Sequence, residues 1–92
     1  MSTWREVMKA AEAAKVIMLS DRAAGEKEFE LLLQHHPKDG MVFFKRGEAY
    51  EALVENTRAA DDFRHALALF PIADWKHRAK DALARVGRPS AG

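Results

Sequence analysis

The 92-residue sequence contains no cysteine, which excludes disulfide bonds and thiolate metal ligands. It has no apolar run near the ~18 residues that a membrane-spanning helix needs. Its first residues, MSTWREVMK, do not combine a charged head with an apolar block, as a secretory signal does. We therefore expect a cytoplasmic protein with no membrane partner.

The sequence also lacks a strong excess of charge and any recognisable catalytic motif. Its formal net charge is +1, so nucleic acid is not an expected partner. It contains neither a glycine-rich phosphate loop nor a nucleophile motif. Asp61 and His65 are spaced to share one helix face, but no third metal ligand accompanies them, and we interpret them as a surface pair. We expect no cofactor, no metal site and no enzymatic activity.

What the sequence does contain is helical patterning. Alanine, leucine, glutamate, lysine and arginine dominate, and no stretch alternates with period two, so the expected fold class is all-α. Predicted N-caps are Thr3, Asp21 and Asp39, then Asn56 or Thr57, then Asp74, and Gly87 is the expected left-handed stop. The pattern predicts five helices, at about residues 4–19, 22–35, 40–54, 57–70 and 75–86.

Comparison of the sequence with itself reveals an internal repeat. A shift of 34 residues aligns Phe29 with Phe63 and Pro37 with Pro71. A fixed period of this size is typical of stacked helix pairs, each too small to bury its apolar face alone. We expect one domain over 1–87, made of repeat 1 at about 4–37, repeat 2 at about 38–71 and a capping helix at about 74–87. Residues 88–92 are expected to form a tail or linker.

Small residues also align in the two repeats. The shift pairs Ala13 with Gly47 and Gly25 with Ala59, so each repeat has one glycine and one alanine. An interior glycine costs a helix roughly 0.5–1 kcal/mol relative to alanine, so it needs a compensating role. We expect these residues to mark close antiparallel crossings of the paired helices.

The second repeat resembles the tetratricopeptide repeat, a 34-residue helix-turn-helix unit. The matching positions are Phe43, Gly47, Tyr50, Ala59, Phe63, Ala66 and Pro71. The first repeat departs from the pattern at Lys9, where the family has an aromatic residue. The resemblance implies an α-solenoid fragment that acts as a non-catalytic protein-interaction module, with a concave groove for a peptide or helix of a partner protein.

Placing the sequence on the family pattern also implies groove residues: Met18, Met41, Phe44, Lys45, Glu48 and Arg78. Phe43 should face the paired helix, which leaves Phe44 to turn toward the concave side. Basic residues near Phe44 favour a partner that is both acidic and apolar. Two alternatives stay open: these residues line an open groove, or the five helices curl so tightly that they become core.

A second function is compatible with the same sequence. No preceding repeat would cover Met8, Val16 and Leu19 on the outer side of the first helix. Exposed apolar side chains grouped in this way often mark an interaction surface. The protein is then a self-associating structural or docking domain, either a homodimer or part of a larger assembly.

Overall fold

The computed structural model describes residues 3–87 and is all-helical over that range, with five α-helices and no strand. The helices are α1 (Trp4–Ser20), α2 (Arg22–His35), α3 (Gly40–Ala52), α4 (Asn56–Leu69) and α5 (Ala73–Val86). The predicted fold class and the number of helices are confirmed. The predicted tail at 88–92 lies outside the described residues.

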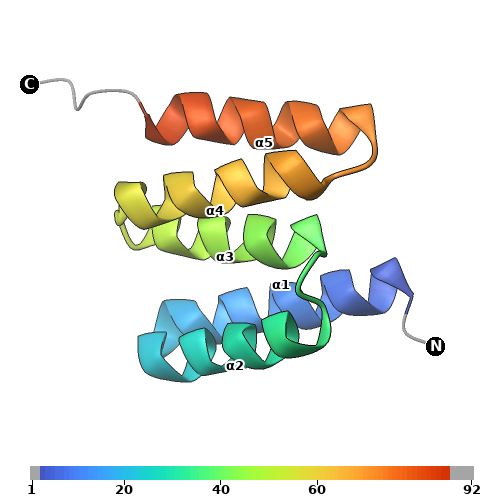
Figure 1. Ribbon diagram of the computed structural model, residues 1–92. Coiled ribbons are helices and arrows are strands. Elements are labelled where there is room, and N and C mark those ends of the chain that lie inside the picture. The colour runs from blue at the N-terminus through green and yellow to red at the C-terminus, as the bar shows by residue number, and fades with distance from the viewer. Residues whose placement is uncertain (1–2, 88–92) are drawn as a thin grey trace, which may run out of the picture.

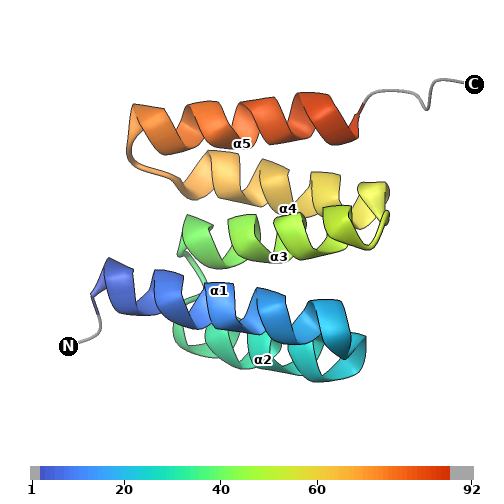
Figure 2. The same cartoon turned by 180° about the vertical axis from the view of Figure 1, so that it is seen from behind.

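The helices stack one after another in a single array (Figure 1). Helix α1 packs against both α2 and α3, α3 packs against α4, and α4 packs against α5. Figure 2 shows α1 and α3 side by side on the opposite face of the array. Because neighbouring helices run antiparallel, α1, α3 and α5 all begin at one end of the molecule (Figure 1). This arrangement is consistent with a helical repeat.

Three of the five predicted N-caps are confirmed. The side chains of Thr3, Asp21 and Asp39 accept hydrogen bonds from backbone N–H groups in the first turns of α1, α2 and α3. The other caps were predicted wrongly. Helix α4 follows Glu55 and α5 follows Ile72, neither with a side-chain cap, and Gly87 has φ −83° and not the left-handed conformation.

The close helix crossings are present, although their partners differ from the prediction. A Cβ atom added to Gly25 would lie 2.2 Å from the Cα of Met18, so the backbones of α1 and α2 are in contact there. A Cβ added to Gly47 would lie 2.7 Å from the ring of Phe63. Ala59 is fully buried, as a crossing residue should be. Ala13 is exposed, so its predicted contact with Gly25 is wrong.

The position of Ala13 follows from the turn between α1 and α2. Helices α2 and α4 keep the 34-residue register, but only Asp21 separates α1 from α2, whereas three residues separate α3 from α4. The buried Ala11 and Ala14 of α1 align with the buried Phe44 and Gly47 of α3 at a shift of 33, one residue less than the repeat, and one residue rotates a helix face by about 100°. As a result Ala14, not Ala13, is the buried counterpart of Gly47 in α1.

Candidate functional site

Three of the six predicted groove residues lie in the core. Met18 is fully buried, and Met41 and Phe44 are 5% and 7% exposed. Side chains so deeply buried are not accessible to a partner, so their assignment to an open groove is wrong. Of the two alternatives that the sequence left open, the structure shows the core for these three residues.

Phe44 is buried against aromatic rings of both the fourth and the fifth helix segments. Its ring centre lies 5.5 Å from that of Phe63, 5.8 Å from that of Phe70 and 5.9 Å from that of Trp75 on α5. Aromatic rings at these separations attract one another in addition to the area that they bury. Phe43 faces the paired helix as predicted, because its ring stacks on His65 of α4 at 4.9 Å.

The predicted groove residues Lys45 and Glu48 belong to an ion-pair network between α1 and α3. The Nζ of Lys45 lies 3.1 Å from a carboxylate oxygen of Glu12 and 3.3 Å from one of Glu48. Lys15 pairs with the same two carboxylates. Partial burial opposes ionisation of Glu12, but Lys15 and Lys45 outweigh it, so the pKa of Glu12 is lowered. The two lysines and the two glutamates therefore neutralise one another.

Arg78 is exposed on α5, where its guanidinium carbon lies 4.6 Å from the ring centre of Trp75. This is the distance of a cation–π contact. Nearby, Arg85 of α5 pairs with Glu51 of α3. The six predicted residues are therefore not one surface: three are core, two belong to a partly exposed ion-pair network between α1 and α3, and one covers a tryptophan ring.

A better candidate site lies at the end of the array where α1, α3 and α5 begin. A pocket of about 650 Å³ opens there, between the start of α1, the α2–α3 connection and the α4–α5 connection. Trp4 and Ile72 are 58% and 57% exposed at this pocket. The lining is mostly apolar: Trp4, His36, Pro37, Lys38, Asp39, Gly40, Met41, Leu69, Phe70, Pro71, Ile72 and Trp75.

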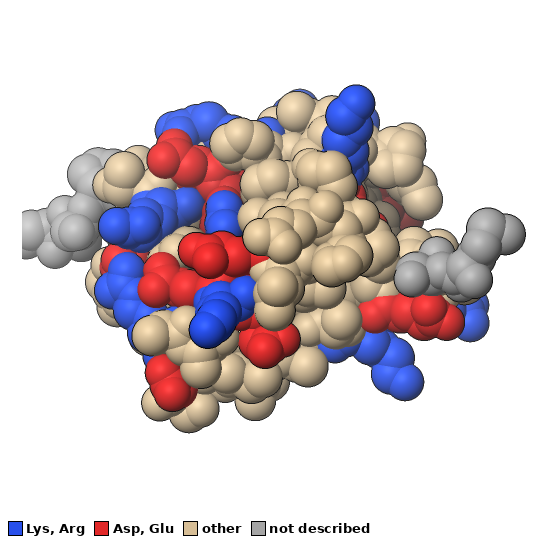
Figure 3. Space-filling model, turned by 60° about the horizontal axis from the view of Figure 1, so that its bottom comes forward, with Lys and Arg blue, Asp and Glu red and all other residues tan. Residues whose placement is uncertain are grey.

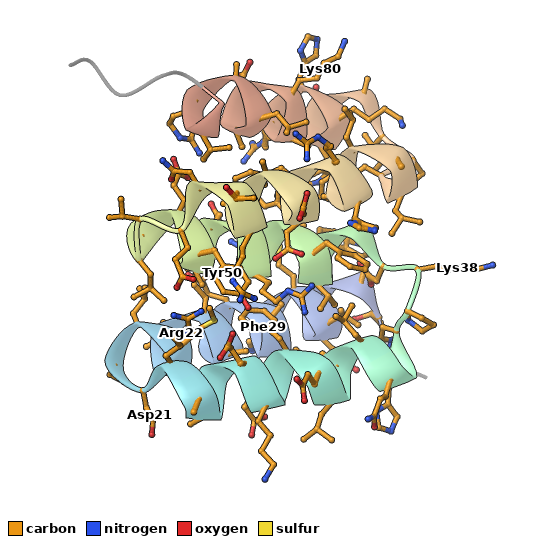
Figure 4. All side chains as sticks on the ribbon, turned by 60° about the vertical axis from the view of Figure 1, so that its left-hand side comes forward. Asp21, Arg22, Phe29, Lys38, Tyr50 and Lys80 are labelled. Atoms are coloured by element: carbon orange, nitrogen blue, oxygen red, sulfur yellow. The ribbon has the colours of Figure 1, made fainter. Side chains whose placement is uncertain are left out.

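Both cationic and acidic residues lie around this pocket, with Glu6 and Asp74 in the first turns of α1 and α5. Lys38 lines it and projects from the α2–α3 connection away from the helices (Figure 4). Arg5 and Arg78 lie over the pocket tryptophans Trp4 and Trp75, respectively. The carboxylate of Asp39 also lines the pocket, but it accepts a hydrogen bond from the N–H of Met41 as the cap of α3. The cations available to a ligand at this pocket are therefore Lys38, Arg5 and Arg78.

Sequence reasoning missed this pocket because its walls come from three separated segments. Two signals pointed toward it. Pro37 and Pro71 occupy equivalent positions of the two repeats, and each ends a helix at the same end of the array. Both tryptophans of the chain lie at or near the start of a helix, which places them at that end as well.

A second, smaller hollow of about 300 Å³ lies between α2, α3 and α4 and is polar. The hydroxyl of Tyr50 donates a 2.7 Å hydrogen bond to Glu26 of α2, with Arg22 and Arg58 over its ring. Figure 4 shows Arg22 and Tyr50 between α2 and α3. Figure 3 shows cationic and anionic side chains intermingled over half of the face seen there.

The nearby Arg46 and Asp62 form a two-point ion pair, with N–O distances of 2.9 and 2.8 Å. Asp62 is buried, and this burial raises its pKa even though Arg46 lowers it. In this hollow the Tyr50–Glu26 hydrogen bond joins α3 to α2, and the Arg46–Asp62 pair joins α3 to α4. We interpret the hollow as structural.

Comparisons of the chain with protein-family models, with curated proteins and with solved structures found no match. Among residues 3–87, no three histidine or carboxylate side chains lie together in a way that could hold a metal ion. No helix in that range is long and apolar enough to cross a membrane.

Proposed function

We propose that this protein is a non-catalytic interaction module of the tetratricopeptide-repeat type, and that it binds an apolar, acidic segment of a partner protein. The observation that carries the proposal is the 650 Å³ apolar pocket at the start of α1, α3 and α5. The binding surface is this pocket, in place of the groove expected from the sequence.

The repeat assignment is supported by the packing of the second helix pair. The small and aromatic positions of the pattern coincide with buried residues, among them Gly47, Ala59, Phe63 and Ala66. The pairing of α1 with α2 and of α3 with α4 fits two such units, with α5 as the cap. Tetratricopeptide-repeat modules bind partner proteins through their surface, and the proposed role of this chain is of that kind.

The pocket has the features of a protein contact surface. Ile72 is 57% exposed, so covering the rest of its side chain contributes about 1–1.7 kcal/mol. Tryptophan is also among the residues that contribute most to protein interfaces. A partner that inserts one large apolar side chain between Trp4 and Trp75 would cover both rings.

The charges around the pocket determine which partner residues are favourable beside the inserted apolar side chain, which we call the anchor. Lys38, Arg5 and Arg78 surround or adjoin the pocket, so acidic side chains beside the anchor would gain favourable contacts. These cations are exposed, and added salt should therefore weaken binding. An apolar anchor flanked by basic residues should bind less tightly than one flanked by acidic residues.

The test uses peptides selected from a random library displayed on phage, with the whole chain as bait. Trp4 and Trp75 are the only tryptophans, and both line the pocket, so tryptophan fluorescence reports occupancy directly. We expect selected peptides to combine an apolar residue with Asp or Glu, and to change this fluorescence on binding.

Variants locate the binding surface. Ile72→Glu should weaken binding about tenfold or more, which corresponds to about 1.4 kcal/mol. Leu31→Glu is the matched control, because Leu31 is also exposed but does not line the pocket. Equal loss in both variants, or no loss in Ile72→Glu, would show that the pocket is not the binding surface.

A further inference from the structure

Gly40 lines the apolar pocket at the point where α3 begins beside the last turn of α4 (Figure 1). It is buried, and a Cβ atom added to it would lie 2.9 Å from the ring of Phe70 and 3.2 Å from the carbonyl oxygen of Ala66. Carbon atoms prefer a separation of about 3.5–4.0 Å, so the ring of Phe70 occupies space that only glycine leaves free. Gly40 therefore determines where this ring can lie.

The ring of Phe70 is itself part of the pocket lining, and other rings surround it. Phe70 is 5% exposed, and its ring centre lies 5.8 Å from that of Phe44 and 5.6 Å from that of Trp75. With Gly40 and these two rings against it, the open space next to Phe70 is the pocket. A side chain larger than glycine at position 40 would therefore push the ring of Phe70 toward the pocket and make the pocket shallower.

The first repeat shows that the packing of a helix pair does not itself need this glycine. In the 33-residue register of α1 with α3, the residue that corresponds to Gly40 is Val7, which is buried. The residue that corresponds to Phe70 at the end of α2 is His36. The combination of a glycine with an aromatic ring therefore belongs to the pocket and not to the general pattern of the repeat.

The lining of the pocket favours an aromatic ring as its occupant. The rings of Phe70 and Trp75 are tilted by 32° to each other, and Trp4 adds a third ring to the lining. Aromatic rings attract one another in offset and edge contacts, in addition to the area that they bury. We propose that the partner inserts an aromatic side chain into this pocket, and that Gly40 gives the pocket the depth to accept it. This inference rests on the proposed binding function.

Two peptides from the library selection, which differ only in the anchor, test this proposal. The anchor is Phe in one peptide and Val in the other, and the unmodified protein should bind the Phe peptide more tightly. Gly40→Ala should weaken the Phe peptide about fivefold or more relative to the Val peptide, which is the low end of what overpacking costs. Equal weakening of both peptides, or none, would overturn the role of Gly40. Selected peptides without aromatic anchors would overturn the aromatic occupant.

Two further variants show whether Gly40→Ala acts through the ring of Phe70. Phe70→Leu removes the ring that the new methyl group would meet, so in this background Gly40→Ala should no longer change the preference between the two peptides. A change that persisted would show that α3 had moved away from α4 instead, and would contradict the proposal. Gly87→Ala is the matched control, because it adds the same methyl group outside the pocket and should leave the preference unchanged.

The variant Ile72→Glu separates this inference from the proposed function. If Ile72→Glu weakens both peptides but Gly40→Ala leaves their preference unchanged, the pocket binds the partner and only the role of Gly40 is wrong. If Ile72→Glu leaves the affinity of both peptides unchanged, the peptides bind elsewhere and both proposals are overturned.

Discussion

Replacement of Gly25 by alanine is expected to destabilise the protein by about 2 kcal/mol, although alanine is the better helix former. The added Cβ would lie 2.2 Å from the Cα of Met18, whereas carbon atoms prefer about 3.5–4.0 Å. Helices α1 and α2 would have to separate by about 1.5 Å. The atom in the way belongs to the backbone, so no side-chain rotation relieves the clash.

The magnitude is the difference between two effects. Overpacking costs about 1–3 kcal/mol, and a clash with backbone belongs at the upper end of that range. Replacing an interior glycine by alanine stabilises the helix by roughly 0.5–1 kcal/mol. The net loss of about 2 kcal/mol would lower the melting temperature of a domain of this size by about 8–16 °C.

Urea unfolding followed by far-ultraviolet circular dichroism measures this loss. Gly47→Ala should cost less than Gly25→Ala, because its new Cβ meets the ring of Phe63, which can tilt. Ala13→Gly, on the exposed side of α1, isolates the effect of helix propensity and should cost about 1 kcal/mol. If Gly25→Ala were as stable as the unmodified protein, the close crossing of α1 and α2 would be refuted.

Three further predictions concern single side chains. Val54→Gly should raise the free energy of unfolding in urea by about 1 kcal/mol. Val54 has φ 60° and is 78% exposed, so glycine relieves backbone strain without loss of packing. A lower free energy of unfolding would contradict this. Burial and the Glu26 carboxylate raise the pKa of Tyr50, so the folded state keeps a proton that the unfolded state loses, and stability should fall as pH rises above about 10. Tyr50 is the only tyrosine, so phenolate absorbance follows its titration, and Tyr50→Phe should remove its contribution to that fall; an unchanged fall would argue against it. Phe44→Ala should cost about 3–5 kcal/mol of folding stability, measured in urea, as expected for a core ring, and a loss below 1 kcal/mol would contradict its core position.

Local signals predicted the helices well. The N-caps Thr3, Asp21 and Asp39 act on the residues that immediately follow them, so the sequence near each one determines where its helix begins. Pro37 and Pro71 likewise end helices through a clash with their own neighbours. The caps of α4 and α5 were missed because neither helix has a side chain bonded to its first turn.

The candidate site was harder to predict because it depends on distant segments. Phe44 is buried against Phe63, Phe70 and Trp75, which all lie outside α3, so the pattern of α3 alone could not reveal its burial. The phase of α1 depends on a turn of one residue, and the 34-residue alignment assumed two equal turns. The pocket combines Trp4 with residues 36–41 and 69–75 and has no contiguous sequence signature.

The one-residue turn at Asp21 also determines where the chain can tolerate insertions and deletions. Its N–H bonds to the carbonyl of Ile17, which closes α1, while its carboxylate accepts from Ala24, which opens α2. Because Asp21 alone ends one helix and begins the next, this turn has no other residues that could accommodate an insertion. An extra residue there would turn α1 by about 100° and carry Met18 out of the core. The turn at 53–55 has exposed residues on both sides, so natural variation in length should collect in that turn and avoid residue 21.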